Sequence, residues 1–213
     1  MERKYIIQRV SKPLKENTWD LLPKAEIDHY LWEKNGYEPR AEVAVCYSDT
    51  GLHIQFTTWE NNITVRNLSE NSPVYEDSCV EFFLNPMPEK DTRYMNFETN
   101  AAGKLLLGMG SGRSDWRLLD KADHSLFGVR SSVPGNGYDS FAGPSWTIEY
   151  TIPFEFIKEY YTGFQPKAGK LIKGNFYKCG DKTSYPHYGC WALIDSAVAD
   201  FHAPHFFGSL LLE

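Results

Sequence analysis

The chain has 213 residues, of which 42% are hydrophobic and 15% aromatic, and its formal net charge at pH 7 is −6. This negative charge, with no run of Lys or Arg, argues against nucleic acid and anionic membranes as partners. No apolar run is long enough for a membrane span or a signal peptide, so we expect a cytoplasmic protein, with secretion as the alternative. The length fits a single domain over 1–213 with one sizeable core.

Strand-like segments recur along the chain and are separated by turn residues, a spacing typical of an all-β fold. The predicted strands are 41–47, 52–59, 79–85, 94–99, 104–109, 146–152, 174–179, 191–194 and 207–212. Between them, 110–145 is rich in Gly and Ser, and we predict loops there with a weak strand near 127–133. Only 153–161 predicts a helix, with Pro153 at its first position. We therefore expect an antiparallel β-sandwich with one short helix.

The predicted strand 79–85 has two different faces. Alternation places Val80, Phe82 and Leu84 on an apolar face and Glu81 on the opposite face. The apolar face is expected to join the core. The face that carries Glu81 is a candidate binding surface.

The next predicted strand, 94–99, continues this candidate surface. Tyr94, Asn96 and Glu98 share one face, and Met95 lies on the other. Tyr, Asn and Glu side chains can stack on an apolar ring and can donate or accept hydrogen bonds, as sugar binding requires. Asn175 in the strand 174–179 could extend the same surface.

Glu81 and Glu98 also allow a second hypothesis, a small hydrolase or lyase that acts on carbohydrate with this carboxylate pair. A third is a haem protein with a Met and a His as iron ligands, but Met95 and Met109 have the spacing of core residues. A fourth is a scaffold whose aromatic residues bind another protein. No nucleophile, phosphate-binding or zinc motif supports an enzyme.

Four cysteines, Cys46, Cys79, Cys179 and Cys190, are too few to staple a domain of this size, so free thiols are expected. Cys179 and Cys190 flank an apparent turn and could pair if the protein were secreted.

Calcium is the one cofactor that the acidic residues suggest. Glu76, Asp77, Asp91 and Asp181 lie near predicted turns, where carboxylates can supply oxygen ligands. They follow no known calcium-loop order, so solvated turn acids are the favoured interpretation.

Three runs of sequence together resemble a known family. They are 74–86 (VYEDSCVEFFLNP), 94–103 (YMNFETNAAG) and 201–208 (FHAPHFFG). The chain from Trp19 to its end is similar to carbohydrate-binding module family 9 and its DOMON-like relatives. The resemblance implies a jelly-roll β-sandwich that binds sugar ends without catalysis, in members attached to enzymes that cleave xylan.

The resemblance also implies which residues contact the sugar. Tyr75 stands at the first of two stacking rings, where a Trp is usual, and Tyr188 or Trp191 would supply the second ring. Polar contacts would come from the face that carries Glu81. The expected carbohydrate-binding residues are Tyr75, Glu81, Tyr94, Asn96, Glu98, Asn175, Tyr188 and Trp191.

Overall fold

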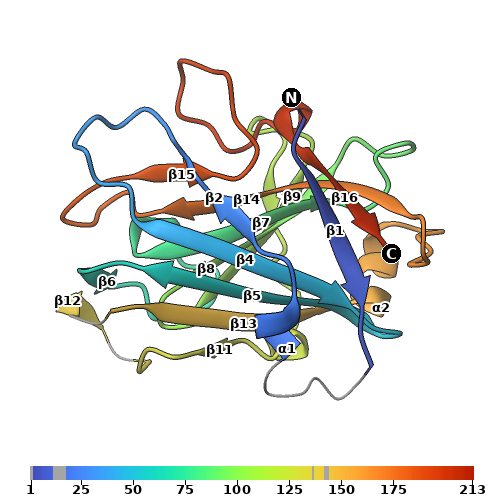
Figure 1. Cartoon of the computed structure of the whole chain (residues 1–213), viewed down its shortest axis with the longest axis horizontal. Coiled ribbons are helices and arrows are strands. Elements are labelled where there is room, and N and C mark those ends of the chain that lie inside the picture. Colours follow the sequence, from blue (N-terminus) through green and yellow to red (C-terminus); the bar gives the residue numbers. More distant parts are fainter. Residues whose placement is uncertain (1, 12–17, 136, 142–143) are drawn as a thin grey trace.

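The computed structural model describes residues 2–11, 18–135, 137–141 and 144–213, and most of them lie in or between β-strands (Figure 1). The strands form a strongly curled mixed sheet whose two halves face each other across the main core. The first half has the order β10 (Arg117–Leu118), β9 (Leu105–Gly110), β8 (Tyr94–Asn100), β7 (Cys79–Asn85), β14 (Leu171–Cys179) and β16 (Gly208–Leu212). The second half has the order β4 (Arg40–Tyr47), β5 (Gly51–Trp59), β13 (Trp146–Pro153) and β11 (Arg130–Ser131).

β1 (Lys4–Arg9) joins the two halves, and both of its pairings are parallel. Lys4 to Ile7 pair with β16, whereas Gln8 and Arg9 pair with the end of β4. The other strand pairs are antiparallel, as the sequence predicted for most of the sheet. β1 was not among the predicted strands, and its parallel pairing joins segments that lie far apart in the sequence.

Shorter elements complete the fold. The short strands are β2 (Ala25–Ile27), which pairs with β4, β3 (His29–Tyr30), which pairs with β15 (Tyr188–Cys190), and β6 (Ile63–Val65), which pairs with β12 (Tyr138–Phe141). The helices are α1 (Thr18–Leu21), α2 (Phe154–Tyr160) and the 3₁₀ turns η1 (Val74–Glu76), η2 (His124–Phe127) and η3 (Pro204–Phe206). The described residues thus contain two short α-helices, where the sequence predicted one.

α2 confirms the predicted helix, with Pro153 as its N-cap residue and not at the first helical position. The weak strand expected near 127–133 is reduced to β11, preceded by η2.

The alternation predicted for β7 and β8 is confirmed. Val80, Phe82 and Leu84 are buried in the main core together with Met95. Met95 and Met109 are both core residues, at 0% and 1% exposure, which removes the basis for the haem hypothesis. The opposite face of β7 and β8 lies outside the main core and is covered by loops.

The prediction of a strand at 191–194 is wrong. The ladder between β14 and β15 ends at Cys190, and the side chain of Asn175 then binds the backbone of Ala192. Its Oδ1 accepts a hydrogen bond from the Ala192 N–H, and its Nδ2 donates to the Ala192 carbonyl, both at 2.8 Å. The Asn175 side chain thus makes the hydrogen bonds that the backbone of a neighbouring strand would otherwise make. Alternation in the sequence cannot reveal such a contact.

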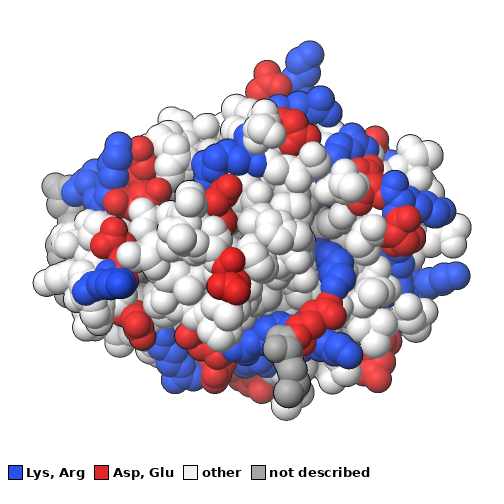
Figure 2. Space-filling view, turned by 90° about the horizontal axis from the view of Figure 1, so that it is seen from above, with Lys and Arg blue, Asp and Glu red and all other residues white. Residues whose placement is uncertain are grey.

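No helix among the described residues is long and apolar enough to cross a membrane. On the face shown in Figure 2, basic and acidic residues are interspersed, and this face has no continuous basic patch.

Candidate functional site

A pocket of about 620 Å³ lies on the side of β7, β8 and β14 that faces away from the main core. Strand residues form its floor, and loops from distant parts of the chain form its walls. The aromatic lining residues are Trp32, Tyr75, Phe83, Trp116, Tyr188 and Phe201. The charged ones are Glu81, Glu98, Arg113, Asp181 and Asp200. Aromatic rings around a few polar groups are typical of a small-molecule site.

Glu81 and Glu98 lie side by side on the pocket floor, because they are directly paired between β7 and β8. Their side chains are almost fully buried. Burial, followed by the neighbouring Cys179 and Glu98, raises the pKa of Glu81 well above its usual range. Burial also raises the pKa of Glu98 to about 8, although its hydrogen bond with Asn96 acts in the opposite direction. Protonated carboxyls can both donate and accept hydrogen bonds.

Glu81 and Glu98 come from adjacent positions of one sheet face, and both line the same pocket. They can therefore offer two carboxyls to one ligand.

Asn96 lies beneath the pocket and positions two residues that line it. It is completely buried, its Nδ2 donates to Oε1 of Glu98 at 2.7 Å, and its Oδ1 accepts from Nε1 of Trp116 at 2.6 Å. Gly108, which pairs with Asn96, leaves the space that Trp116 occupies, since a Cβ there would lie 2.3 Å from Nε1 of Trp116. Asn96 therefore orients a carboxyl and a ring at the site.

Tyr94 is also buried beneath the pocket. Its ring stacks on Phe83, and its hydroxyl is 2.6 Å from Nδ1 of His202, which does line the pocket. Like Asn96, Tyr94 supports residues that line the pocket. Sequence reasoning identified both positions but predicted that they contact the sugar directly.

His202 gives a pH-dependent prediction. Burial and the nearby Arg113 lower its pKa to about 4, although Asp200 acts in the opposite direction. The unfolded chain binds this proton below about pH 6.5, whereas the folded protein does so only below about pH 4. Stability from His202 is therefore present above pH 6.5 and is lost as the pH falls towards 4.

As the pH falls from 7 to 5, we expect the lowered pKa of His202 to reduce the free energy of unfolding by about 2 kcal/mol. Urea unfolding at both pH values should show this loss as the difference between the wild type and His202→Gln, since other titrating groups are common to both. Equal pH dependence in the two proteins would contradict the assignment.

Of the two candidates for the second stacking ring, one lies in the aromatic wall of the pocket. Tyr188 lines the pocket and lies 5.9 Å from Trp32, measured between ring centroids. Trp32 is also 5.8 Å from Phe201. Tyr75, the predicted first ring, lines the pocket with 38% of its surface exposed. Tyr75 and Tyr188 are thus brought to the same pocket.

The structure does not bring Trp191 and Asn175 to the pocket. Trp191 is 2% exposed and packs in the main core, 5.4 Å from Phe176 between ring centroids. Asn175 is buried and occupied by its bonds to Ala192. As a correction, both are structural residues: Trp191 follows the end of β15 and packs in the core, and Asn175 holds the backbone of Ala192.

Several lining residues were missed by sequence reasoning. Trp32, Arg113, Trp116 and Asp200 come from loops or irregular segments, where alternation gives no signal. Trp116 offered the one usable signal, because a Trp within a stretch rich in Gly and Ser has no core position of its own. Asp181, considered as a calcium ligand, also lines the pocket.

The four cysteines are free and buried. Cys179 and Cys190 belong to separate hydrophobic clusters, and the residue opposite Cys179 on β7 is Cys79. The pairing of Cys179 with Cys190, which the sequence left open, is therefore not present.

The four acids considered for calcium do not converge. Asp77 accepts backbone hydrogen bonds from Arg66 and Asn67, Asp91 forms an ion pair with Arg93, and Glu76 pairs with Lys182. These contacts account for Asp77, Asp91 and Glu76, whereas Asp181 lines the pocket near Glu76.

Comparisons with known proteins give the family and the fold of this chain. The profile of Carbohydrate-binding family 9 matches residues 14–212. No curated protein sequence matches the chain. A crystal structure of a candidate carbohydrate-binding protein from Bacteroides uniformis is 29% identical, with a TM-score of 0.85 and full coverage of both chains.

A family 9 carbohydrate-binding module from Caldicellulosiruptor kristjanssonii shares the fold in two solved complexes. With glucose it has a TM-score of 0.67 at 12% identity, and covers 99% of this chain and 96% of that one. With cellotriose the values are 0.66 and 13%, with coverage of 99% and 94%. The family match over nearly the whole length shows that this chain belongs to carbohydrate-binding family 9, as a non-catalytic carbohydrate-binding module.

Proposed function

We propose that the pocket over β7, β8 and β14 binds one end of a neutral, glucose-type saccharide. The observation that carries this proposal is the exposed ring of Tyr75 beside the buried carboxyls of Glu81 and Glu98, all within one pocket of about 620 Å³. A ring can stack on the apolar face of a sugar while carboxyls bond its hydroxyls. The complexes of the Caldicellulosiruptor relative with glucose and cellotriose support this ligand class.

Each residue has a distinct proposed role. Tyr75 and Tyr188 provide the stacking surfaces, with Trp116 as a further ring held by Asn96. Glu81 and Glu98 bind hydroxyls from the floor. Oε2 of Glu98 is buried and has no hydrogen-bond partner in the described part of the chain, so a sugar hydroxyl would satisfy it.

Calorimetric titration with glucose, cellotriose and xylotriose tests the proposal. Stacking and a few hydrogen bonds, offset by the cost of immobilising the sugar, predict a Kd of roughly micromolar to millimolar. Stronger binding of xylotriose than of cellotriose would favour the xylan ligand that the family resemblance suggests. Absence of heat with every sugar would overturn the proposal.

Tyr75→Ala should weaken sugar binding by roughly 5-fold to 30-fold, because a stacking ring contributes about 1 to 2 kcal/mol. Tyr185→Ala is the matched control: Tyr185 is also exposed but does not line the pocket. Calorimetry on both variants measures the effect. Equal affinities in the two variants would remove Tyr75 from the site.

A further inference from the structure

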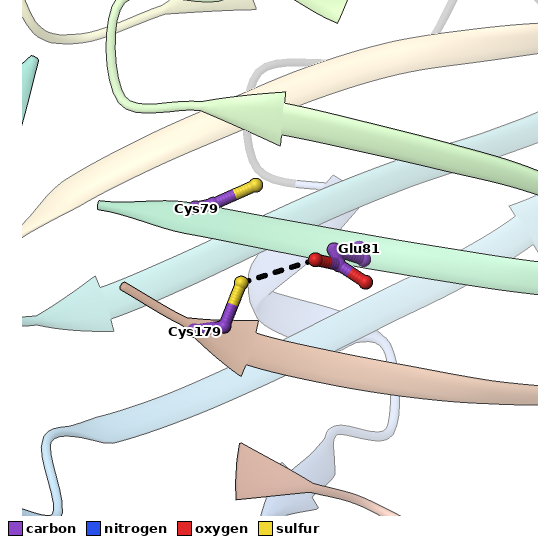
Figure 3. A group of neighbouring side chains, drawn as sticks. All are labelled: Cys79, Glu81 and Cys179. Atoms are coloured by element: carbon purple, nitrogen blue, oxygen red, sulfur yellow. Dashed lines mark hydrogen bonds between the residues drawn. The ribbon is translucent and has the colours of Figure 1, made fainter. Parts of the chain in front are cut away.

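Two thiols and a carboxyl lie close together where β7 pairs with β14 (Figure 3). Cys79 and Glu81 lie on β7, two residues apart and therefore on the same face. Cys179 lies on β14 directly opposite Cys79 in the antiparallel pairing. The strand register thus places all three side chains next to one another.

The distances suit a single small ion. Sγ of Cys179 donates to Oε1 of Glu81 at 3.0 Å, and one ligand atom from each of the three residues lies within 4.8 Å of the others. Around a tetrahedral zinc ion, with bonds of about 2.0 to 2.3 Å, ligand atoms are roughly 3.3 to 3.8 Å apart. Small side-chain rotations would therefore bring the three atoms onto one ion.

The surroundings of this cluster are acidic. Glu98 is paired with Glu81 across the strands, and Asp181 follows Cys179 by two residues and lines the same pocket. Among the described residues, no Lys or Arg forms an ion pair with Glu81 or Glu98. Lys178 is engaged by Glu60, and Arg113 by Asp200. A bound cation would compensate this concentration of acidic groups.

A second, independent observation is the unpartnered oxygen on the floor. Oε2 of Glu98 is buried without a hydrogen-bond partner, although Glu98 is only 4% exposed. A water on a metal ion at this end of the floor could donate to that oxygen. Glu81 and Cys179 both line the pocket, so the ion would have an entry path and an open fourth position.

We propose that Cys79, Cys179 and Glu81 form a binding site for a thiophilic divalent cation of the zinc class, with its fourth position open to the pocket. Two sulfur ligands select such an ion over calcium or magnesium. On binding, both thiols and the Glu81 carboxyl release their protons to the solvent.

The test is a titration of the reduced full-length protein with Cd²⁺, which forms an ultraviolet charge-transfer band with thiolates, followed by competition with Zn²⁺. We expect one ion per chain. Cys79→Ser and Cys179→Ser should each lower the affinity at least about tenfold. Cys46→Ser is the matched control, because Cys46 is equally buried but belongs to a separate cluster, and it should leave the affinity unchanged. Calcium and magnesium should not displace the ion.

X-ray absorption at the zinc edge of the wild-type protein gives a readout that does not depend on variants folding. Two sulfur neighbours at about 2.3 Å are expected. Absence of a charge-transfer band, equal affinity in Cys79→Ser and Cys46→Ser, or a zinc shell without sulfur would each overturn the proposal. Sugar titrations on the same samples report separately on the proposed function.

Discussion

Lys178→Met should lower the free energy of unfolding by about 3 to 5 kcal/mol, the cost of leaving one buried charge without its partner. Lys178 and Glu60 are 0% and 1% exposed, and Nζ of Lys178 lies 3.2 Å from Oε2 of Glu60. Lys178 follows the alternation of β14 into the interior, and Glu60 directly follows β5. This ion pair therefore connects the two halves of the curled sheet.

The polar groups around this ion pair are also satisfied. Trp146 Nε1 and Ser78 Oγ donate to Glu60, at 3.1 and 2.9 Å. Nζ of Lys178 donates to Nε2 of His187 at 2.7 Å, and Nδ1 of the same ring lies 2.8 Å from the carbonyl of Tyr185, which makes it the donor there. Burial and the charge of Lys178 lower the pKa of His187 well below its usual value, consistent with a neutral ring.

Urea unfolding at pH 7 measures the loss in free energy of unfolding, and two further variants test whether the buried ion pair is its cause. Lys158→Met removes an exposed partner of Glu155, for which a loss of less than about 1 kcal/mol is expected. The double variant Lys178→Met with Glu60→Gln removes both charges, so it should be more stable than Lys178→Met alone. Equal losses in Lys178→Met and Lys158→Met would show that the buried pair does not have the stated role.

Sequence reasoning succeeded where side-chain alternation determines the outcome. The hydrophobic pattern of β7 and β8 correctly separated Phe82 and Met95 in the core from Glu81 and Glu98 on the other face. Alternation states which face a residue occupies, but not which strand is its neighbour. The parallel pairing of β1 and the opposition of Cys79 and Cys179 both depend on that second choice, so they became visible only in the structure.

The pocket walls were less predictable for a related reason. Trp116 reaches the pocket because Gly108 leaves room for it and Asn96 holds its ring nitrogen, contacts that join three separate segments. The prediction for Trp191 was wrong in the opposite direction, because a residue expected at the pocket lies in the core. The family resemblance offered Trp191, the first residue of a predicted strand, as a stacking ring. In the structure Asn175 bonds the next residue and the Trp191 ring packs in the core. Long-range contacts decide both cases.

Glu81→Met should weaken sugar binding by roughly 10-fold to 150-fold. Met keeps about the same length but can neither donate nor accept at the pocket floor, so a sugar hydroxyl would lose its partner at a cost of about 1.5 to 3 kcal/mol. The effect should exceed that of Tyr75→Ala, because Glu81 is almost fully buried whereas the Tyr75 ring is 38% exposed. Calorimetric titration with glucose and cellotriose measures both variants.

Glu149→Met is the matched control, since Glu149 also lies on a strand but bonds Gln55 and Arg130 away from the pocket. Cys79→Ser adds a second comparison, because Cys79 is buried beneath the pocket and is not part of its lining. If Glu81 acts on the sugar directly, Cys79→Ser should retain wild-type affinity in metal-free buffer while Glu81→Met does not. Equal losses in these two variants would instead mean that Glu81 serves the sugar site only as part of the cysteine cluster.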